Sequence, residues 1–309
     1  MSDASVPASA GLDYFIADVF TEEPLAGNPL AVVMNMRGFE TAQMQAIARE
    51  FNLSETTFVE RRSQEAERVE GVRVRIFTPQ EELPFAGHPT LGTASVLMAN
   101  SPETAHNGTV TLALNVGPVP VRFEPSDGSK WFGEMTQRDP EFGAKLSGLE
   151  VAPLLGLAAE DLDTAFVPQV VSTGNPFAIV VLRSVEALGR MKVDQEKATA
   201  WLRERGARWF YALAAEIDQD QGPAQPWRAR MQFYGGEDPA TGSAAGCAIS
   251  YLVALGAVPP ETRVHVRQGV EIGRPSDLFL SAGMKSARVT DVRVAGSTVL
   301  VAKGLLFQP

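Results

Sequence analysis

Hydrophobic and polar positions follow two different periods along this chain, and the two periods predict alternating strands and helices. Residues 71–78, GVRVRIFT, alternate between apolar and polar side chains, which is the pattern of a half-buried strand. Residues 41–51, TAQMQAIAREF, place apolar side chains three and four positions apart, which is the spacing of one helix face. Residues 263–303 are expected to form short strands joined by glycine turns. Further strands are expected within 14–20, 30–34, 55–60, 109–124, 170–182, 209–216 and 229–235, and a further helix at 193–206.

Two segments are apolar almost all round and predict buried helices. They lie at about 88–100, HPTLGTASVLMAN, and at about 241–256, and each follows a glycine-containing turn. A helix without a polar face has no side to turn toward water, so other elements must enclose it. A curved sheet wrapped around each helix meets this requirement.

The second half of the sequence resembles the first. GNPLAVV at 27–33 matches GNPFAIV at 174–180, and the segment 82–99 aligns with 237–254. The identical pairs in the longer match are Glu82/Glu237, Pro84/Pro239, Gly87/Gly242, Ser95/Ser250, Leu97/Leu252 and Ala99/Ala254. Because both matches occur in the same order with similar spacing, we infer an internal duplication. The predicted fold class is α+β, with two pseudo-symmetric domains, each a curved, barrel-like sheet around a buried central helix.

Length and charge limit the range of partners. A chain of 309 residues suggests two domains of roughly 150 residues each. The formal net charge of −10, with no basic stripe, argues against nucleic acid and against an acidic membrane surface as partners. No apolar run reaches the roughly 18 residues that span a membrane, and residues 1–13 lack the pattern of a secretion signal. We therefore expect a cytoplasmic protein.

The starts of the two buried helices predict an anion site. Each helix start offers about four free N–H groups and roughly half a positive charge. If a pseudo-two-fold axis relates the halves, the two starts face each other across a cleft and can hold an anion within an acidic protein. The alternative is that both turns serve only as helix caps.

Four segments, in order along nearly the whole chain, resemble one enzyme family. They are NPLAVV at 28–33, NLSETTFV at 52–59, RIFTPQEELPFAGHPTLGTA at 75–94 and GEDPATGSAAG at 236–246. Together they resemble the phenazine-biosynthesis-like (PhzF-like) isomerases, whose fold is similar to that of diaminopimelate epimerase. The resemblance implies two related barrels with a cleft between them, no cofactor and a homodimer.

The same resemblance implies where the domains divide. The N-terminal domain is expected at 1–128 together with about 292–309, because the last strand should return to it. The C-terminal domain is expected at 129–291, with the active-site cleft between the two domains.

The chain departs from the epimerases of this fold at the positions of their catalytic cysteines. Those enzymes use two opposed cysteines, one before each central helix, whereas here the matching turns carry Ala86 and Pro239. Neither side chain can take a proton, so two-base thiol chemistry is excluded. The single cysteine, Cys247, lies inside the second helix segment and is expected to be a packed thiol.

The resemblance points instead to one carboxylate, Glu55 in LSETTF. A carboxylate of raised pKa can remove a proton from an allylic system and return it on the same face, acting as base and then as acid. Burial beside an apolar wall, such as Phe58 or Phe85, would raise the pKa. The alternative for Glu55 is a solvated acid at the start of a strand.

Two more titratable residues lie at the starts of the buried helices. His88 would polarise or protonate the substrate's oxygen or ring carbon, and its alternative is a histidine that only caps the helix. Asp238 would bind a hydroxyl or amine of the substrate, or hold His88. Its alternative is an acid favoured by the helix dipole.

Four residues at the helix starts are expected to bind substrate. Ser243, with the N–H groups of Gly242 and Ala244, would take a substrate carboxylate, and Ser243 can also serve as the N-cap. Gly87 would contribute through its backbone only. No zinc spacing is present in the sequence, so no metal site is expected.

The function that we expect from these residues is isomerisation without a cofactor. One proton would move next to a carboxylate-bearing carbon of a small anionic metabolite, with Glu55, His88 and Asp238 as catalytic residues. The first alternative is a lyase or dehydratase that begins with the same proton abstraction. The second is a non-catalytic protein that binds a small carboxylate.

Overall fold

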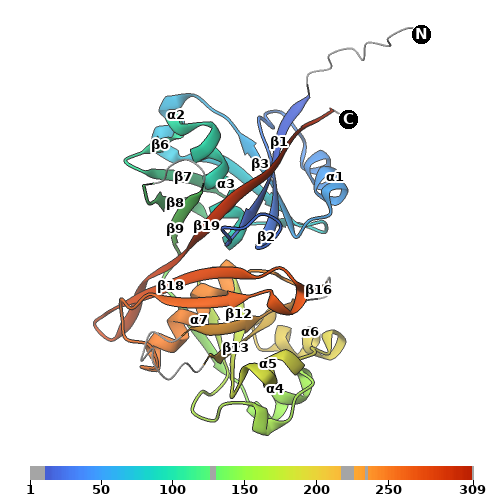
Figure 1. The fold of residues 1–309 in the computed structure, drawn as a ribbon, viewed down its shortest axis with the longest axis vertical. Helices are drawn as coiled ribbons and strands as arrows, with labels where there is room; N and C mark the ends of the chain where they lie inside the picture. The colour runs from blue at the N-terminus through green and yellow to red at the C-terminus, as the bar shows by residue number, and fades with distance from the viewer. Residues whose placement is uncertain (1–10, 126–129, 217–225, 234–235, 308–309) are drawn as a thin grey trace, which may run out of the picture.

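The computed structural model describes residues 11–125, 130–216, 226–233 and 236–307. The chain forms two stacked halves, each with a curved sheet and a central helix (Figure 1). The expected domain limit at residue 128 lies outside the described residues, as do Tyr234 and Gly235 of one expected strand, so the proposed domain division stays a prediction.

The first sheet closes into a barrel of eight strands. Its neighbours pair in the order β1–β2–β3–β4–β7–β8–β9–β19, and β19 also pairs with β1, which closes the circle. The strands are β1 (Leu12–Val19), β2 (Asn28–Val33), β3 (Glu55–Glu60), β4 (Val72–Phe77), β7 (Thr109–Leu114), β8 (Gly117–Phe123), β9 (Trp131–Thr136) and β19 (Arg288–Leu306). Helix α3 (Gly87–Asn100) is its central helix, α1 (Thr41–Phe51) packs on the outside, and α2 (Gln64–Glu70) lies beside β4 and β7.

The second sheet repeats this design with more helices outside. Its order is β10–β11–β12–β13–β14–β17–β18–β19. The new strands are β10 (Glu141–Lys145), β11 (Gln169–Ser172), β12 (Pro176–Leu182), β13 (Trp209–Ala215), β14 (Trp227–Arg230), β17 (Val264–Gln268) and β18 (Ser276–Lys285). Helix α7 (Gly242–Ala254) is central, and the outer helices are α4 (Gly148–Leu154), α5 (Val185–Arg190) and α6 (Gln195–Glu204) (Figure 1). Short strands β5 (Glu82–Leu83), β6 (Ala105–His106), β15 (Gln232–Phe233) and β16 (Gly236–Glu237) complete the structure, with 3₁₀ turns η1 (Pro102–Thr104), η2 (Ala159–Asp161) and η4 (Val270–Ile272).

The strand registers reproduce the duplication seen in the sequence. The parallel pair β2–β3 aligns Leu30 with Glu55, and the parallel pair β12–β13 aligns Phe177 with Trp209. Both halves continue with an antiparallel pair and then a parallel pair, β3–β4–β7 and β13–β14–β17. Glu55 and Trp209 therefore occupy equivalent places in the two halves.

The two central helices are buried as predicted. Every residue from Gly87 to Leu97 in α3, and from Gly242 to Val253 in α7, is buried. The expected fold of two curved sheets around buried helices is confirmed. No helix in the described ranges is long and apolar enough to cross a membrane.

The expectation of short strands joined by glycine turns within 263–303 is correct only for the first part of this segment. Strand β17 has 5 residues, and Gly269 and Gly273, both with positive φ, lie in the turn to β18. The rest of the segment differs from the expectation. Strand β18 has 10 residues and β19 has 19, and β19 runs from the second sheet into the first (Figure 1). Gly296 lies within β19 and makes no turn. A Cβ atom there would approach Phe20 Cδ1 to 2.5 Å and Asp277 O to 3.1 Å, so this glycine allows close packing.

Candidate active site

A cavity of about 440 Å³ lies between the two halves, and both halves line it. Three of the expected site residues, Glu55, Asp238 and Ser243, are in its wall. The apolar part of the wall consists of Leu53, Leu83, Ala86, Phe177, Trp209, Met231 and Phe233 together with prolines 29, 79 and 239. This mixture of an apolar wall and a few convergent polar groups is typical of small-molecule sites.

The starts of the two central helices meet at this cavity. A Cβ atom added to Gly87 would lie 2.6 Å from Ser243 N and 2.8 Å from Gly242 Cα, so the two backbones are in contact. Neither N-cap residue, Ala86 or Thr241, caps its helix with a side-chain hydrogen bond in the described structure. Two helix starts with N–H groups that no side chain caps therefore converge on one place, which favours an anion there.

The N-cap of the second helix differs from the expectation. Thr241, and not Ser243, is the N-cap residue of α7. The hydroxyl of Thr241 donates to Asp238 Oδ2 at 2.7 Å and is thereby turned away from the helix N–H groups. Ser243 remains on the cavity wall, and Ala244 is buried behind it.

Glu55 begins β3 and is almost buried, with 16% of its side chain exposed. Its Oε2 lies 3.4 Å from His88 Nε2, and neither atom has a hydrogen-bond partner among the described residues. Burial raises the pKa of Glu55 well above 4.5, and the negative charge of Asp238 raises it further. Glu55 is therefore protonated over a wider pH range than an exposed glutamate.

Phe58 was expected to form part of the apolar wall beside Glu55, and this expectation is wrong. Phe58 lies an odd number of positions along β3 from Glu55, so the two side chains point to opposite faces. Phe58 packs with α1 on the outer face, whereas Thr57, on the face of Glu55, contacts Thr93 of α3 at 2.8 Å.

His88 lies in the first turn of α3, next to Pro89, and is 3% exposed. Burial lowers the pKa of His88 to about 3. The positive end of the helix dipole also disfavours the charged form. His88 is therefore a neutral imidazole at ordinary pH, suited to donate or accept one hydrogen bond at each ring nitrogen.

Asp238 precedes α7 and is held on both carboxylate oxygens. Oδ1 accepts from Asn28 Nδ2 at 2.7 Å, and Oδ2 accepts from Thr241 Oγ1 at 2.7 Å. Burial raises the pKa of Asp238 to about 6, although these two hydrogen bonds act in the opposite direction. The backbone oxygen of Asp238 accepts from Gln268 Nε2 at 2.8 Å.

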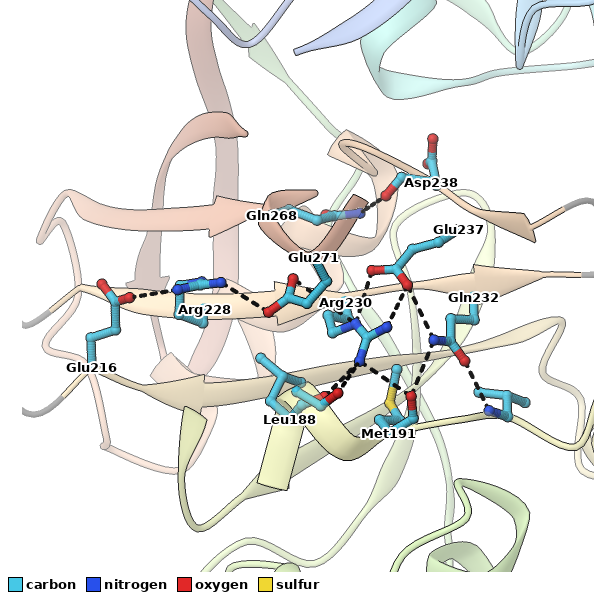
Figure 2. A network of polar contacts seen from close by, with 12 residues as sticks. Leu188, Met191, Glu216, Arg228, Arg230, Gln232, Glu237, Asp238, Gln268 and Glu271 are labelled. Atoms are coloured by element: carbon cyan, nitrogen blue, oxygen red, sulfur yellow. Dashed lines mark hydrogen bonds and ion pairs between the residues drawn. The ribbon is translucent and has the colours of Figure 1, made fainter. Parts of the chain in front are cut away.

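A buried ion pair anchors the residue before Asp238 (Figure 2). Arg230 donates to both oxygens of Glu237, at 2.9 and 2.6 Å, and the side chains are 8% and 7% exposed. Arg230 Nη1 also donates to the backbone oxygens of Leu188 and Met191 near the end of α5. In Figure 2 the carboxylate of Glu237 points into this network and that of Asp238 points away from it. The clamp thus fixes the backbone that presents Asp238 to the cavity.

The remaining thiol is packed. Cys247 is fully buried in α7, and its sulfur lies 3.6 Å from Thr173 Oγ1 and 3.7 Å from Asn175 O. Burial raises the pKa of this thiol to about 11, which leaves it neutral. No cluster of three or more potential metal ligands occurs within the residues that the structure describes.

Sequence reasoning missed several residues that hold the site, and Asn28 is foremost among them. Asn28 is fully buried, and its Nδ2 lies 3.1 Å from His88 Nδ1, besides donating to Asp238 and to Ala240 O. The repeated GNP of the two halves marked this asparagine, but the repeat did not say what the side chain contacts. Thr241, Gln268 and Arg230 carried no comparable signal.

A family model described as "Phenazine biosynthesis-like protein" matches residues 17–304. The chain belongs to this family. A trans-2,3-dihydro-3-hydroxyanthranilate isomerase of Pseudomonas aeruginosa is 37% identical over 297 residues, which are 95% of this chain and 99% of that protein. The expected resemblance is confirmed, and the protein is an isomerase, as its curated relatives are named.

Solved structures agree with this family and with the expected fold class. A phenazine biosynthesis protein of the PhzF family from Bacillus anthracis has a TM-score of 0.82 at 26% identity, over 96% of this chain and 99% of that one. A probable proline racemase from Agrobacterium radiobacter shares the fold at a TM-score of 0.59 and 12% identity, over 95% of this chain and 92% of that one. The homodimer expected for the phenazine biosynthesis-like family stays a prediction.

Proposed function

We propose that this isomerase moves a proton next to a carboxylate-bearing carbon of a small anionic metabolite, with Glu55 as the single acid and base. The observation that carries the proposal is the pair formed by Glu55, at the start of β3, and His88, in the first turn of α3. Oε2 and Nε2 lie 3.4 Å apart, and neither atom has a hydrogen-bond partner among the described residues. A buried polar atom without a hydrogen-bond partner lowers the stability of the folded protein. A bound substrate can supply the missing hydrogen bonds to Oε2 and Nε2.

The substrate carboxylate is proposed to bind at the two helix starts. The N–H groups of Gly242, Ser243 and Ala244 and the Ser243 hydroxyl can hold it, supported by the positive ends of both helices. The apolar wall then covers the rest of the molecule and excludes water. This pose leaves the carbon beside the carboxylate on the cavity side of the Glu55–His88 pair, next to the Glu55 carboxyl group.

Proton transfer is proposed to occur on one face of the substrate. Glu55, as carboxylate, takes the proton from one carbon of an allylic system, the double bond shifts, and the protonated Glu55 returns the proton to the far carbon. The raised pKa of Glu55 favours both steps, because it makes the carboxylate a stronger base and keeps the proton available. Neutral His88 polarises the substrate, and Asp238 binds a hydroxyl or amine.

The proposal is tested with trans-2,3-dihydro-3-hydroxyanthranilate, the substrate in the names of several relatives. The compound is incubated with the protein in deuterated buffer and followed by NMR. Conversion of the compound to an isomer supports an isomerase of this substrate. Deuterium at the receiving carbon reports that the proton on Glu55 exchanged with solvent before its return, and hydrogen there reports direct return. Loss of water identifies a lyase, and binding without conversion identifies a non-catalytic binder; either outcome overturns the proposal for this compound.

Glu55→Gln tests the role of the carboxylate. The variant keeps the shape and hydrogen-bonding capacity of the side chain but removes the group that titrates. We expect turnover to fall by at least about 10²-fold with little change in substrate binding. Proton exchange at close to the wild-type rate would contradict the assignment and transfer the base to His88 or Asp238.

A further inference from the structure

Asn28 contacts two of the three titratable groups of the site, His88 and Asp238, although the proposed chemistry gives it no part. It opens β2 in the first half, and its amide nitrogen reaches Asp238 Oδ1 at 2.7 Å and Ala240 O at 2.8 Å in the second half. The same nitrogen lies 3.1 Å from His88 Nδ1. Asn28 is fully buried, so water does not compete for these contacts.

The two oxygen neighbours fix which way the amide of Asn28 points. The carbonyl oxygen of Ala240 can only accept a hydrogen bond, and the carboxylate of Asp238 also accepts when it is ionised. The amide nitrogen must therefore face them, and the Oδ1 atom points to a place without a partner among the described residues. The opposite orientation would bring Oδ1 against these two oxygens.

The orientation of Asn28 in turn fixes the proton on His88. An amide nitrogen has no lone pair that can accept a hydrogen bond, so a proton on His88 Nδ1 would face another donor at 3.1 Å. Nδ1 therefore carries its lone pair, and the single proton of the neutral ring is on Nε2. Nε2 is the nitrogen that faces Glu55 Oε2.

We propose that Asn28 is a positioning residue that holds His88 in the tautomer with its proton on Nε2, facing Glu55, and ties this pair to Asp238 across the cleft. The catalytic consequence rests on the proposed function, because Nε2–H is the group that would meet Glu55 and the substrate. The tautomer itself does not depend on any substrate.

The duplication supplies a matched control. Asn175, in the second GNP, donates from Nδ2 to Phe85 O at 3.2 Å, and Phe85 and Ala240 are equivalent in the aligned segments. Each asparagine thus makes one bond to the backbone before the opposite helix. Only Asn28 adds contacts to a histidine and an aspartate, so Asn175→Ala removes a tether between the halves without touching the His88 ring.

The test is ¹⁵N NMR of protein labelled at histidine, without ligand. The chain has three histidines, and His106→Gln and His265→Gln assign the signals of the other two by loss. We expect Nδ1 of His88 to show the unprotonated signal and Nε2 the protonated signal around neutral pH. In Asn28→Asp, an oxygen takes the place of Nδ2 and can stay beside Asp238 Oδ1 if the two carboxyl groups share one proton. This oxygen can accept a hydrogen bond from His88, so we expect the ring proton to move to Nδ1 and the two signals to exchange character. Asn175→Ala keeps the wild-type pattern.

Two outcomes overturn the proposal. A proton on Nδ1 in the wild-type protein contradicts it directly, and so does an unchanged tautomer in Asn28→Asp. If Asn28→Asp does not fold, Asn28→Ala replaces it and is expected to populate both tautomers; unchanged signals of His106 and His265 establish that a variant is folded. With a substrate, Asn28→Asp is expected to lower kcat by about 10²-fold or more, the low end for loss of an acid–base group, with a smaller change in KM. Failure of turnover in the wild type would overturn the proposed function and leave the tautomer result intact.

Discussion

The two halves share one topology but present different chemistry at equivalent places. Glu55 aligns with Trp209 in the parallel strand pairs, and His88 aligns with Ser243 at the helix starts. A two-base racemase needs a proton acceptor on both sides of its substrate. Here the indole of Trp209 occupies the place in the second half that the Glu55 carboxylate has in the first, which agrees with the proposal of proton transfer from one side only. Under that proposal, the duplicated helix starts form the anion site, and the residues that differ between the halves form the acid–base site.

Two equivalent ion pairs, one in each half, also differ in their surroundings. Arg75 donates to both oxygens of Glu82 in the first half, as Arg230 does to Glu237 in the second. The side chains of the first pair are 20% and 23% exposed, whereas those of the second are 8% and 7% exposed. The same arginine–glutamate contact is therefore present in both halves, but it is buried only in the second half, where the residue after the glutamate is Asp238.

The largest expected difference between the halves is in the free energy of unfolding after the arginine of each ion pair is replaced. We expect Arg230→Leu to lower the free energy of unfolding by about 3–5 kcal/mol, because it leaves Glu237 charged and buried. Arg75→Leu should cost about 1 kcal/mol or less, because water can solvate Glu82. Urea denaturation of both variants gives the two values, and similar losses would show that burial does not separate the pairs.

An added methyl group at the two helix starts should have unequal effects. In Gly87→Ala the Cβ would press on the backbone of Gly242 and Ser243, so we expect a loss of about 1–3 kcal/mol and weaker anion binding. In Gly242→Ala the Cβ would lie 3.1 Å from the ends of Met135 and Phe20 and 3.3 Å from Gly87 Cα, so shifts of a few tenths of an ångström suffice and the loss should be smaller. Thermal unfolding with and without substrate measures both effects, and the reverse order would contradict this geometry.

The pH dependence of stability should separate the buried carboxyl groups of the site from the more exposed Arg75–Glu82 ion pair, with a smaller effect. The pKa of Asp238 rises from 3.8 to about 6 on folding, so the folded state holds more protons between these values and stability falls as the pH rises through them. Burial of Glu55 acts with the same sign. In Asp238→Asn this decline should become shallower when unfolding is measured between about pH 4 and pH 7.

Glu82 gives the control for this pH prediction. Its hydrogen bond from Arg75 lowers the pKa of Glu82, so its contribution is present above pH 4.5 and is lost on acidification. Glu82→Gln should therefore change the pH profile in the opposite sense to Asp238→Asn. A change of the same sign in both variants would contradict the comparison.

The sequence alone determined the features that depend on local pattern. Segments without a polar face predicted both central helices, and the ordered repeats predicted two equivalent halves, because burial and duplication leave their record in residue types. The same repeats placed Gly87 and Gly242 at matching helix starts. Glu55, His88 and Asp238 were named through motifs of the phenazine biosynthesis-like family. In the structure Glu55 and Asp238 line one cavity, and His88 lies next to Glu55 and Asn28.

Only the tertiary structure decided which partner each polar side chain meets. Glycines within 263–303 were expected to form turns, but Gly296 lies inside a strand, because the sequence does not show that Phe20 packs against it. Ser243 was a possible N-cap because the sequence does not show that Thr241 already fills that position and turns its hydroxyl to Asp238. Asn28 is separated from Asp238 by 210 residues, and hydrogen bonds act over about 3 Å, so their partners are set by the packing of the two halves and not by spacing along the chain.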